Sequence, residues 1–226
     1  MLTIIHNHSS WVIVNKPAGI SMQQEQGDPT SLSLLQLALA AAQKIDNQLM
    51  RLWPVHRLDK ATSGLVIFAK SAAAAAEFGE LFSHQQVNKH YLAIADGKPK
   101  KKQGWIKGDM EKGRNGSWLL KRSLNKPAIT YFNSCAIASE QNLPRRLYLI
   151  APKTGKTHQI RVALKSLATP ILGDQRYKGT AAERCYLHAF AISFDWHGKQ
   201  HHYQCEPEQG QWPDLKQVEL LADFFA

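Results

Sequence analysis

The sequence predicts an α+β fold in which a mixed, mostly antiparallel sheet is flanked by helices and loops. Short apolar runs typical of strands outnumber the helical patterns, and the two do not alternate regularly as they would in a doubly wound fold. No internal repeat and no clear linker divides the 226 residues. We therefore expect residues 1–226 to form a single domain, with a basic insertion at about residues 98–126.

The expected strands are apolar runs bounded by turn residues. Trp11 to Val14, for example, is stopped by an Asn-Lys-Pro-Ala-Gly sequence, and the run from Leu65 follows a Thr-Ser-Gly sequence that is expected to form a compact turn. The strands are predicted at residues 1–6, 11–14, 65–69, 91–95, 128–132, 147–150, 187–194 and 201–205.

The expected helices show apolar residues at helical spacing behind a capping residue. Ser71 is a suitable cap for a helix through the alanine run 72–76, with Phe78, Leu81 and Phe82 facing the core. A third helix opens at Thr157 and ends near Pro170 and Gly173. The first helix is expected to start at Asp28, Pro29 and Thr30 or Ser31, to present Leu32, Leu35, Leu39 and Ala42, and to end near Asp46; a closing helix is expected at residues 218–225.

Composition excludes several classes of protein. The chain is 44% apolar and 20% charged, which is typical of a globular domain, and no run approaches the roughly 18 apolar residues of a membrane span. The N-terminus lacks the pattern of a signal peptide, so a cytoplasmic location is expected. Three widely spaced cysteines argue against a disulfide framework and against a four-cysteine zinc site. His201, His202 and Cys205 are better interpreted as a polar strand edge or loop, and no metal or other cofactor is predicted.

Positive charge is concentrated in residues 98–126, which contain ten Lys and Arg but only two acidic residues, Asp109 and Glu111, and so have a net charge of +8. Interleaved Trp105, Trp118 and glycines suggest a projecting, mobile arm that grips a phosphate backbone. A merely soluble basic loop and an anionic membrane surface are the alternatives, although no amphipathic apolar face accompanies the charge. The predicted RNA-backbone contacts are Lys100, Lys101, Lys102, Lys107 and Arg114.

The stretch from His56 to Leu65 is the most informative in the chain. It places Asp59 between Arg57 and Lys60, directly before a buried strand. A carboxylate on a loop at the edge of a strand is suited to be a rigid nucleophile, and flanking cations would keep it ionised. The alternative is that Asp59 caps the turn and forms a surface ion pair with Arg57.

A second polar stretch runs from Thr154 to Arg161 and contains Gly-Lys-Thr. It is not a phosphate-binding P-loop, because Ile150 stands where that motif needs a glycine. What remains is a turn leading into a helix N-terminus, a modest anion site. His158, Arg161 and Lys165 share the helix face opposite Ile160 and Leu164 and form a cationic stripe.

These two stretches resemble the motifs of pseudouridine synthases of the RluA type, and the resemblance extends from about Ile13 to Phe194. It includes Val12 to Gly19, Lys89 to Ala93, Lys126 to Tyr131, Ile171 to Tyr177 and Leu187 to Ala189. It implies the pseudouridine synthase catalytic fold with a cleft across the sheet, in a stand-alone form without an N-terminal RNA-binding domain.

The resemblance also implies an activity, the isomerisation of uridine to pseudouridine in ribosomal or transfer RNA, without a cofactor. Asp59 would be the nucleophile, Tyr91 the active-site tyrosine and Arg161 the arginine that pairs with Asp59. Substrate binding is expected at four further positions, Arg57, Leu187, His158 and Lys156. Asp59 could attack the ribose or act as a base on it.

Two rival functions differ in class from this one. A catalytically silent RNA-binding or ribosome-assembly protein on the same fold would not need Asp59, Tyr91 and Arg161 together. A metal-dependent nuclease would need a carboxylate cluster that the sequence lacks. RNA is the expected partner, no membrane or obligate protein partner is implied, and the chain is expected to be a monomer.

Overall fold

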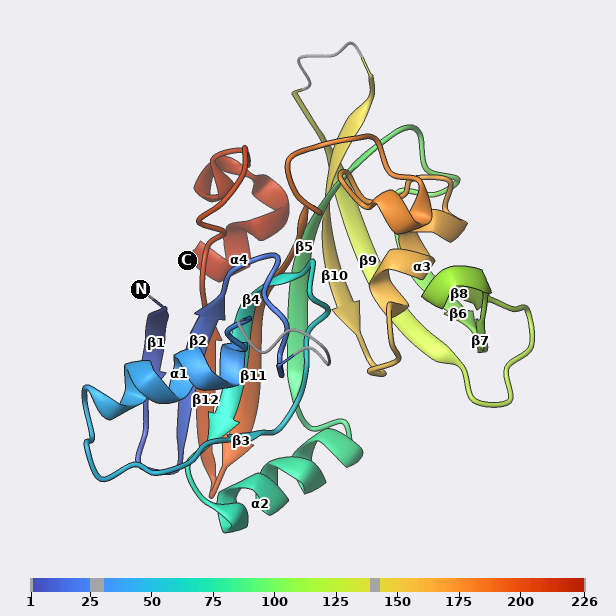
Figure 1. The fold of residues 1–226 in the computed structure, drawn as a ribbon. Coiled ribbons are helices and arrows are strands. Elements are labelled where there is room, and N and C mark those ends of the chain that lie inside the picture. The colour runs from blue at the N-terminus through green and yellow to red at the C-terminus, as the bar shows by residue number, and fades with distance from the viewer. Residues whose placement is uncertain (1, 25–30, 139–142, 226) are drawn as a thin grey trace. The chain divides into compact units, whose positions relative to one another are not determined.

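The apolar runs identified in the sequence form strands in the structure, a computed structural model that describes residues 2–24, 31–138 and 143–225 (Figure 1). The α+β class with a mixed, mostly antiparallel sheet is confirmed. The chain divides into two units, residues 1–88 with 189–207 and residues 89–188 with 208–226. Each unit is described in turn.

In the first unit, β1, β2, β4 and β11 are neighbours in that order, β3 also pairs with β4, and β12 pairs with β11. The β1–β2, β2–β4, β3–β4 and β11–β12 pairings are antiparallel. The strands are β1 (Thr3–Asn7), β2 (Trp11–Lys16), β3 (Trp53–Pro54), β4 (Ser63–Ala69), β11 (Leu187–Trp196, in this unit from residue 189) and β12 (Lys199–Gln204); the helices are α1 (Leu34–Gln43) and α2 (Ala72–Ser83).

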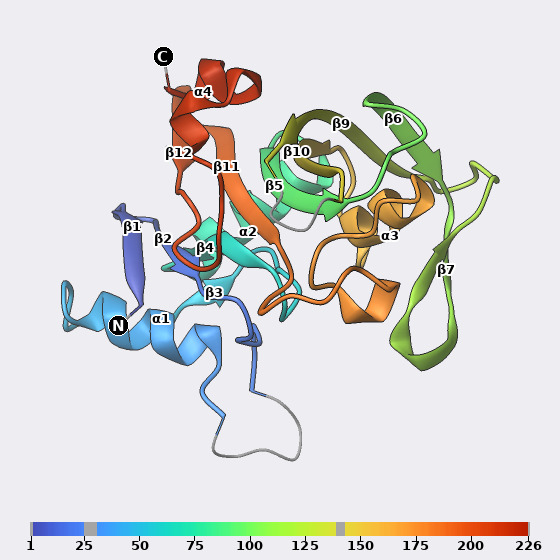
Figure 2. The same cartoon turned by 90° about the horizontal axis from the view of Figure 1, so that it is seen from above.

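Every residue of β2 and of β4 is buried. Because consecutive side chains of a strand point to opposite faces, burial of the whole run means that both faces of these strands are covered. On one face, Trp11 and Phe78 of α2 pack edge to face, with ring centroids 5.7 Å apart, and Phe194 of β11 joins them. The helix α1 packs against β1 and β2 (Figures 1 and 2).

The first helix begins later than predicted. Ser33 is its N-cap and forms a capping box with Gln36: the Ser33 hydroxyl accepts from the Gln36 N–H, and the Gln36 side chain accepts from the Ser33 N–H. The predicted start at Ser31 was therefore wrong, and Asp28, Pro29 and Thr30 lie outside the described residues. The buried face is Leu34, Ala38 and Ala42, with Leu35 and Leu39 at its margin, whereas Leu32 is exposed.

The second helix was predicted correctly. Ser71 caps α2 by accepting a hydrogen bond from the Ala74 N–H at 3.1 Å. Phe78 is fully buried, and Leu81 and Phe82 pack partly buried against the same core.

Three histidines of the first unit lie together at its β1 and β12 strands. The His8 ring stacks on Trp11 with centroids 3.6 Å apart and meets His201 edge to face at 5.8 Å, and His6 lies 4.7 Å from Tyr203. Burial lowers the pKa of each imidazole, and nearby positive groups lower it further: Lys199 acts on His6 and His201, and His201 acts on His8. The folded state therefore favours the neutral form.

This cluster predicts a loss of stability in mild acid. When the pH is below the ordinary histidine pKa of 6.5, these histidines bind more protons in the unfolded chain than in the folded chain. The free energy of unfolding therefore falls as the pH falls through that pKa. Urea unfolding measured between about pH 7 and pH 5 should show this slope. His8→Gln should flatten it, while the exposed His84→Gln on α2 should not; equal slopes in all three proteins would contradict the prediction.

In the second unit, β5, β10, β9 and β6 are neighbours in that order, and every pairing among them is antiparallel. The helix α3 packs against β9 and β8. The elements are β5 (Asn88–Asp96, in this unit from residue 89), β6 (Gln103–Gly108), β7 (Met110–Lys112), β8 (Trp118–Leu120), β9 (Ala128–Ile137), β10 (Arg145–Pro152), α3 (Gln159–Ser166), α4 (Ala222–Phe225) and the 3-10 turns Arg114–Gly116, Gln175–Tyr177, Leu215–Gln217 and Glu219–Leu221.

The closing helix predicted at residues 218–225 is helical from Glu219 to Phe225, but it is not one regular α-helix. The segment contains the 3-10 turn Glu219–Leu221 followed by the single α-helical turn of α4. Leu221 is fully buried, so the segment is anchored by this side chain rather than by a continuous helical face. No helix within the described part of the chain has both the length and the apolar character that a membrane crossing requires.

Candidate functional site

Asp59 lies on the loop that leads from β3 into β4, in the first unit. Its side chain is half-buried, whereas Arg57 and Lys60 on either side are exposed. The Asp59 carbonyl accepts the Thr62 N–H at 3.0 Å, which closes the turn before the strand. The predicted Thr-Ser-Gly turn was wrong in detail: Lys60 and Ala61 form the turn, and β4 already begins at Ser63.

A fully buried lysine holds this loop in place. The ammonium of Lys16, at the end of β2, donates to the carbonyl oxygens of Thr62 at 2.6 Å, Lys60 at 3.0 Å and Pro17 at 3.1 Å. The Gly19 N–H also donates to the Lys60 carbonyl, at 2.8 Å. The backbone on the C-terminal side of Asp59 is thereby fixed to the β2 end. No sequence motif predicted this role for Lys16.

Lys16→Met should loosen the Asp59 loop. Without the ammonium, the three carbonyls lose a charged donor, and breaking a hydrogen-bond network of this kind costs up to about 4 kcal/mol, so we expect a loss of about 2–4 kcal/mol in the free energy of unfolding. Denaturant titration measures this loss, and exposed Lys44→Met on the same unit is the control. Equal stability of the two variants would show that the ammonium does not hold the loop.

The close approach of β4 to β11 requires glycine at position 64. Gly64 has a φ of +112°, and a Cβ placed there would lie 2.3 Å from the carbonyl oxygen of Ala189. A side chain at this position would push β11 away from the strand that follows the Asp59 loop.

A cavity of about 490 Å³ opens beside the loop, within the first unit. The His56 side chain at its wall accepts the Ile67 N–H at Nε2, 2.9 Å away, which places the proton of a neutral ring on Nδ1. The cavity is lined by polar, cationic and apolar residues: Ser21, Met22, Gln23, Pro54, Val55, His56, Arg57, Leu58 and Lys60. Arg57 is thus brought to a cavity, as a substrate-binding residue requires.

The remaining predicted catalytic residues lie in the second unit. Tyr91 is half-buried on β5, where it pairs with Ile150 of β10. Burial, followed by the charge of Lys153, lowers the pKa of its neighbours Lys89 and His90. Leu187 is buried at the start of β11. Tyr91 and Leu187 are therefore presented by strands, the more rigid elements of the fold.

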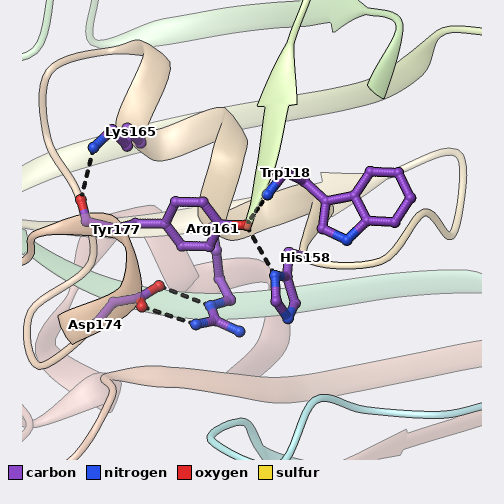
Figure 3. Close-up of polar contacts among 6 residues, drawn as sticks. All are labelled: Trp118, His158, Arg161, Lys165, Asp174 and Tyr177. Atoms are coloured by element: carbon purple, nitrogen blue, oxygen red, sulfur yellow. Dashed lines mark hydrogen bonds and ion pairs between the residues drawn. The ribbon is translucent and has the colours of Figure 1, made fainter. Parts of the chain in front are cut away.

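Arg161 lies in α3, which begins two residues later than predicted, after His158 with a φ of +57°. The side chain is only 6% exposed, so the predicted cationic stripe is not a solvated face at this position. Its Nε and Nη2 donate to the two carboxylate oxygens of Asp174 at 2.7 and 2.8 Å (Figure 3). Asp174 is 2% exposed, and a bidentate pair of this kind orients the guanidinium firmly.

Tyr177 contacts His158, Arg161 and Trp118 of β8. Its ring lies against the Arg161 guanidinium, with 5.1 Å from Cζ to the ring centroid, and its hydroxyl is hydrogen bonded to His158 Nδ1 at 2.8 Å. The same hydroxyl accepts the Trp118 N–H at 3.0 Å (Figure 3). The structure therefore brings together two of the predicted residues, His158 and Arg161, around a tyrosine that had no predicted role.

Lys156 is exposed on the turn before α3. Its N–H donates to the side-chain oxygen of Gln159 at 3.0 Å, and the amide nitrogen of Gln159 donates to the Ile129 carbonyl at 3.0 Å. The buried Gln159 thus fixes the turn to β9, and Lys156 is held by its backbone while its ammonium faces solvent.

The basic segment, predicted as a projecting arm, contains three strands that were not predicted from the sequence. Within it, β6 pairs with β9 in an antiparallel register of six residue pairs, and β7 and β8 form a hairpin beyond it (Figure 2). Lys100, Lys101 and Lys102 are exposed before β6, Lys107 is exposed on it, and Arg114 is exposed in the turn of the hairpin. Lys107 is thus carried by a strand, whereas the other four cations lie in the segment before β6 or in the hairpin turn.

His201, His202 and Cys205, which are metal-ligand residue types close together in the sequence, do not form a metal-binding cluster in the structure. Both histidines lie on β12, and Cys205 is buried after it. Within the residues that the structure describes, no three His, Cys, Asp or Glu side chains are grouped so as to hold a metal ion.

Comparison with known proteins gives a consistent result. The model of the RNA pseudouridylate synthase family matches residues 10–166. An RNA pseudouridine synthase of Haemophilus influenzae, described as uncharacterized, is 45% identical over 93% of this chain and 90% of its own length. The dual-specificity RNA pseudouridine synthase RluA of Pasteurella multocida is 31% identical over 85% of this chain and 86% of its own.

A solved structure has the same fold. Human RNA pseudouridylate synthase domain containing 4 aligns with a TM-score of 0.75 at 24% identity, over 91% of this chain and 88% of its own. Some relatives are longer: the ribosomal large subunit pseudouridine synthase C of Rickettsia bellii is 35% identical over 77% of this chain, which matches 56% of that protein.

Proposed function

This chain belongs to the RNA pseudouridylate synthase family and isomerises uridine to pseudouridine in RNA, and from that premise we propose that Asp59 is the residue that acts on the ribose. The observation that supports this most directly is the fixation of the Asp59 loop by the buried Lys16, which holds a half-buried carboxylate at the edge of β4. Catalysis gains most from groups that are oriented before the substrate arrives.

The reaction first requires the uridine to leave its stack, at a cost of a few kcal/mol. Tyr91 would stack on the extruded uracil, a contact worth about 1–3 kcal/mol per base in comparable cases, and could take part in a later proton transfer. Leu187 would close the pocket against water. Arg57, His158 and Lys156 would contact the substrate.

The chemistry then exchanges one bond for another. With Asp59 either attacking the ribose or acting as a base on it, the bond between uracil nitrogen 1 and the ribose breaks. The uracil rotates and rejoins the ribose through its carbon 5, and the isomerisation is complete when carbon 5 has lost its proton and nitrogen 1 has gained one. Atoms and electrons balance without an oxidant, a reductant or a co-substrate, so we propose no cofactor.

Arg161 is proposed to pair with Asp59 and keep it oriented. The Asp174 carboxylate supports this role, since it already fixes the guanidinium from another side. Because Asp59 lies in the first unit while Tyr91 and Arg161 lie in the second, the proposal also requires both units to work as one catalytic domain.

The RNA target is proposed to be ribosomal or transfer RNA, bound in part through Lys100, Lys101, Lys102, Lys107 and Arg114. The net charge of +8 on residues 98–126 and the ribosomal substrate named for the Rickettsia bellii relative support this proposal. We further propose that the protein acts as a monomer in the cytoplasm, where these RNAs are found.

Mapping of pseudouridine in total RNA from cells with and without the gene tests the target. One or a few uridines should lose the modification without the gene and regain it when the wild-type gene, but not an Asp59→Asn gene, is restored. If no site changes in ribosomal or transfer RNA, and the purified protein modifies neither RNA from the deficient cells, the proposed target is wrong.

A further inference from the structure

Two aromatic side chains stand side by side on the solvent face of the second unit's sheet. Trp105 of β6 is 45% exposed and Tyr131 of β9 is 36% exposed. Within the described part of the chain, they are the aromatic members of the group of exposed large hydrophobic residues. Exposed apolar side chains that lie next to one another are unfavourable in water and often mark a binding surface.

The strand pattern determines that both rings face outward together. Along β6, Gln103, Trp105 and Lys107 are exposed while Ile106 between them is buried. Trp105 is registered directly opposite Tyr131, and the ring centroids are 5.1 Å apart with the planes inclined by 58°. The opposite face of the same strands is occupied, since Thr130 is 2% exposed and receives a hydrogen bond from Gln159 of α3. The aromatic pair therefore lies on the face away from α3.

Cations surround this pair. The Lys107 ammonium lies 5.5 Å from the centre of the indole ring, and the Lys101 ammonium donates to the Trp105 carbonyl at 2.7 Å. A flat apolar surface between ammonium groups is matched by a ligand that has a flat apolar face and negative charge on either side. A nucleotide within an RNA chain has both, whereas an apolar peptide segment would leave the ammonium groups poorly solvated and unpaired.

We propose that Trp105 and Tyr131 form a stacking surface for one unpaired base of the RNA substrate, with Lys107 and Lys101 contacting the phosphates on either side of it. This surface lies on the face of β6 and β9 away from α3, which carries Arg161, so the base that it binds is proposed to be a different nucleotide from the uridine that is isomerised. The inference rests on the proposed function only in that the partner is RNA. It gives the exposed aromatic pair a role in selecting RNA with an unpaired nucleotide at a set distance from the target.

The test compares variants of the full chain in binding to the mapped RNA substrate at several salt concentrations. Trp105→Ala should weaken binding by about 5- to 150-fold, the range found for loss of one base–aromatic stack. Because stacking releases no counterions, the slope of log affinity against log salt should be unchanged. Trp105→Phe should restore most of the affinity.

Lys107→Gln is the matched variant, in which the salt dependence of RNA binding should change. It should lower the salt slope by about 0.7–0.9, as expected for one lost phosphate contact. Leu119→Ala, which also removes an exposed apolar side chain from the basic segment, should bind as the wild type does. With Trp105→Ala the rate at saturating RNA should stay near that of the wild type and the KM should rise, since the ring does not touch the reacting atoms.

Three results would overturn the inference. The first is that Trp105→Ala binds RNA as tightly as the wild type does. The second is that the salt slope falls in Trp105→Ala as it does in Lys107→Gln. The third is that the wild-type protein self-associates in sedimentation and that Trp105→Ala abolishes this association but keeps RNA binding. The last result would assign the surface to a second copy of the chain. Failure of the proposed reaction residues is a separate outcome, because it would appear as full pseudouridine formation by Asp59→Asn.

Discussion

Replacing Asp59 with asparagine is expected to abolish pseudouridine formation. The amide has nearly the same shape but is neither a nucleophile nor a base, and removal of a reacting side chain in other enzymes costs about 10⁴- to 10⁶-fold in rate. Single-turnover assays with the mapped RNA would measure the loss. The loop should remain in place, because the backbone carbonyls of Lys60 and Thr62 that Lys16 binds are unchanged by the substitution.

The expected defect is in chemistry and not in binding. Asp59→Asn should bind RNA with about the wild-type affinity, since most affinity for a nucleic acid comes from phosphate contacts. Glu80→Gln, an exposed carboxylate change on α2 in the same unit, should keep full activity. Substantial product formation by Asp59→Asn would refute the assignment of Asp59.

Breaking the Arg161–Asp174 pair is expected to cause the largest loss of stability. Both side chains are buried, and the pair is bidentate. Removal of one partner from a buried ion pair typically costs about 3–5 kcal/mol, because the other charge stays in a poorly solvated place. Asp174→Leu should show this loss in urea unfolding, together with a large fall in the rate of pseudouridine formation.

A double-mutant cycle separates stability from catalysis. Arg161→Met combined with Asp174→Leu replaces the pair by apolar side chains and should recover much of the stability lost in either single variant. Activity should not return, because the guanidinium is gone. Glu111→Gln, which breaks an exposed pair with Lys121, is the control and should cost less than about 1 kcal/mol. A stable Asp174→Leu protein would contradict the prediction.

Local signals explain which elements could be predicted. The continuous apolar run of β4 and the Ser71 cap of α2 act within a few residues, and both appeared in the structure as expected. The start of α1 was missed although its signal is equally local, since Ser33 and Gln36 have the spacing of a capping box.

The basic segment shows where local signals fail. Its charge concealed the alternation of exposed and buried residues in β6, and that strand exists because β9, whose paired residues are 20–30 positions away, supplies its hydrogen-bond partners. A strand requires a partner, so its presence depends on tertiary contacts more than a helix does.

The sequence alone determined the chemical groups of the proposed site: Asp59, Tyr91 and Arg161 each stand in a motif that a single chain displays. Tertiary structure decided what holds them. Lysine is rarely buried, so nothing in the sequence marks Lys16 as the anchor of the Asp59 loop, 46 residues from Thr62, whose carbonyl it binds. Asp174 and Tyr177 reach Arg161 only after the chain has turned back from α3. Reactive residues can be read from a motif because chemistry selects the residue type, whereas supporting contacts depend on which segments folding brings within hydrogen-bond distance.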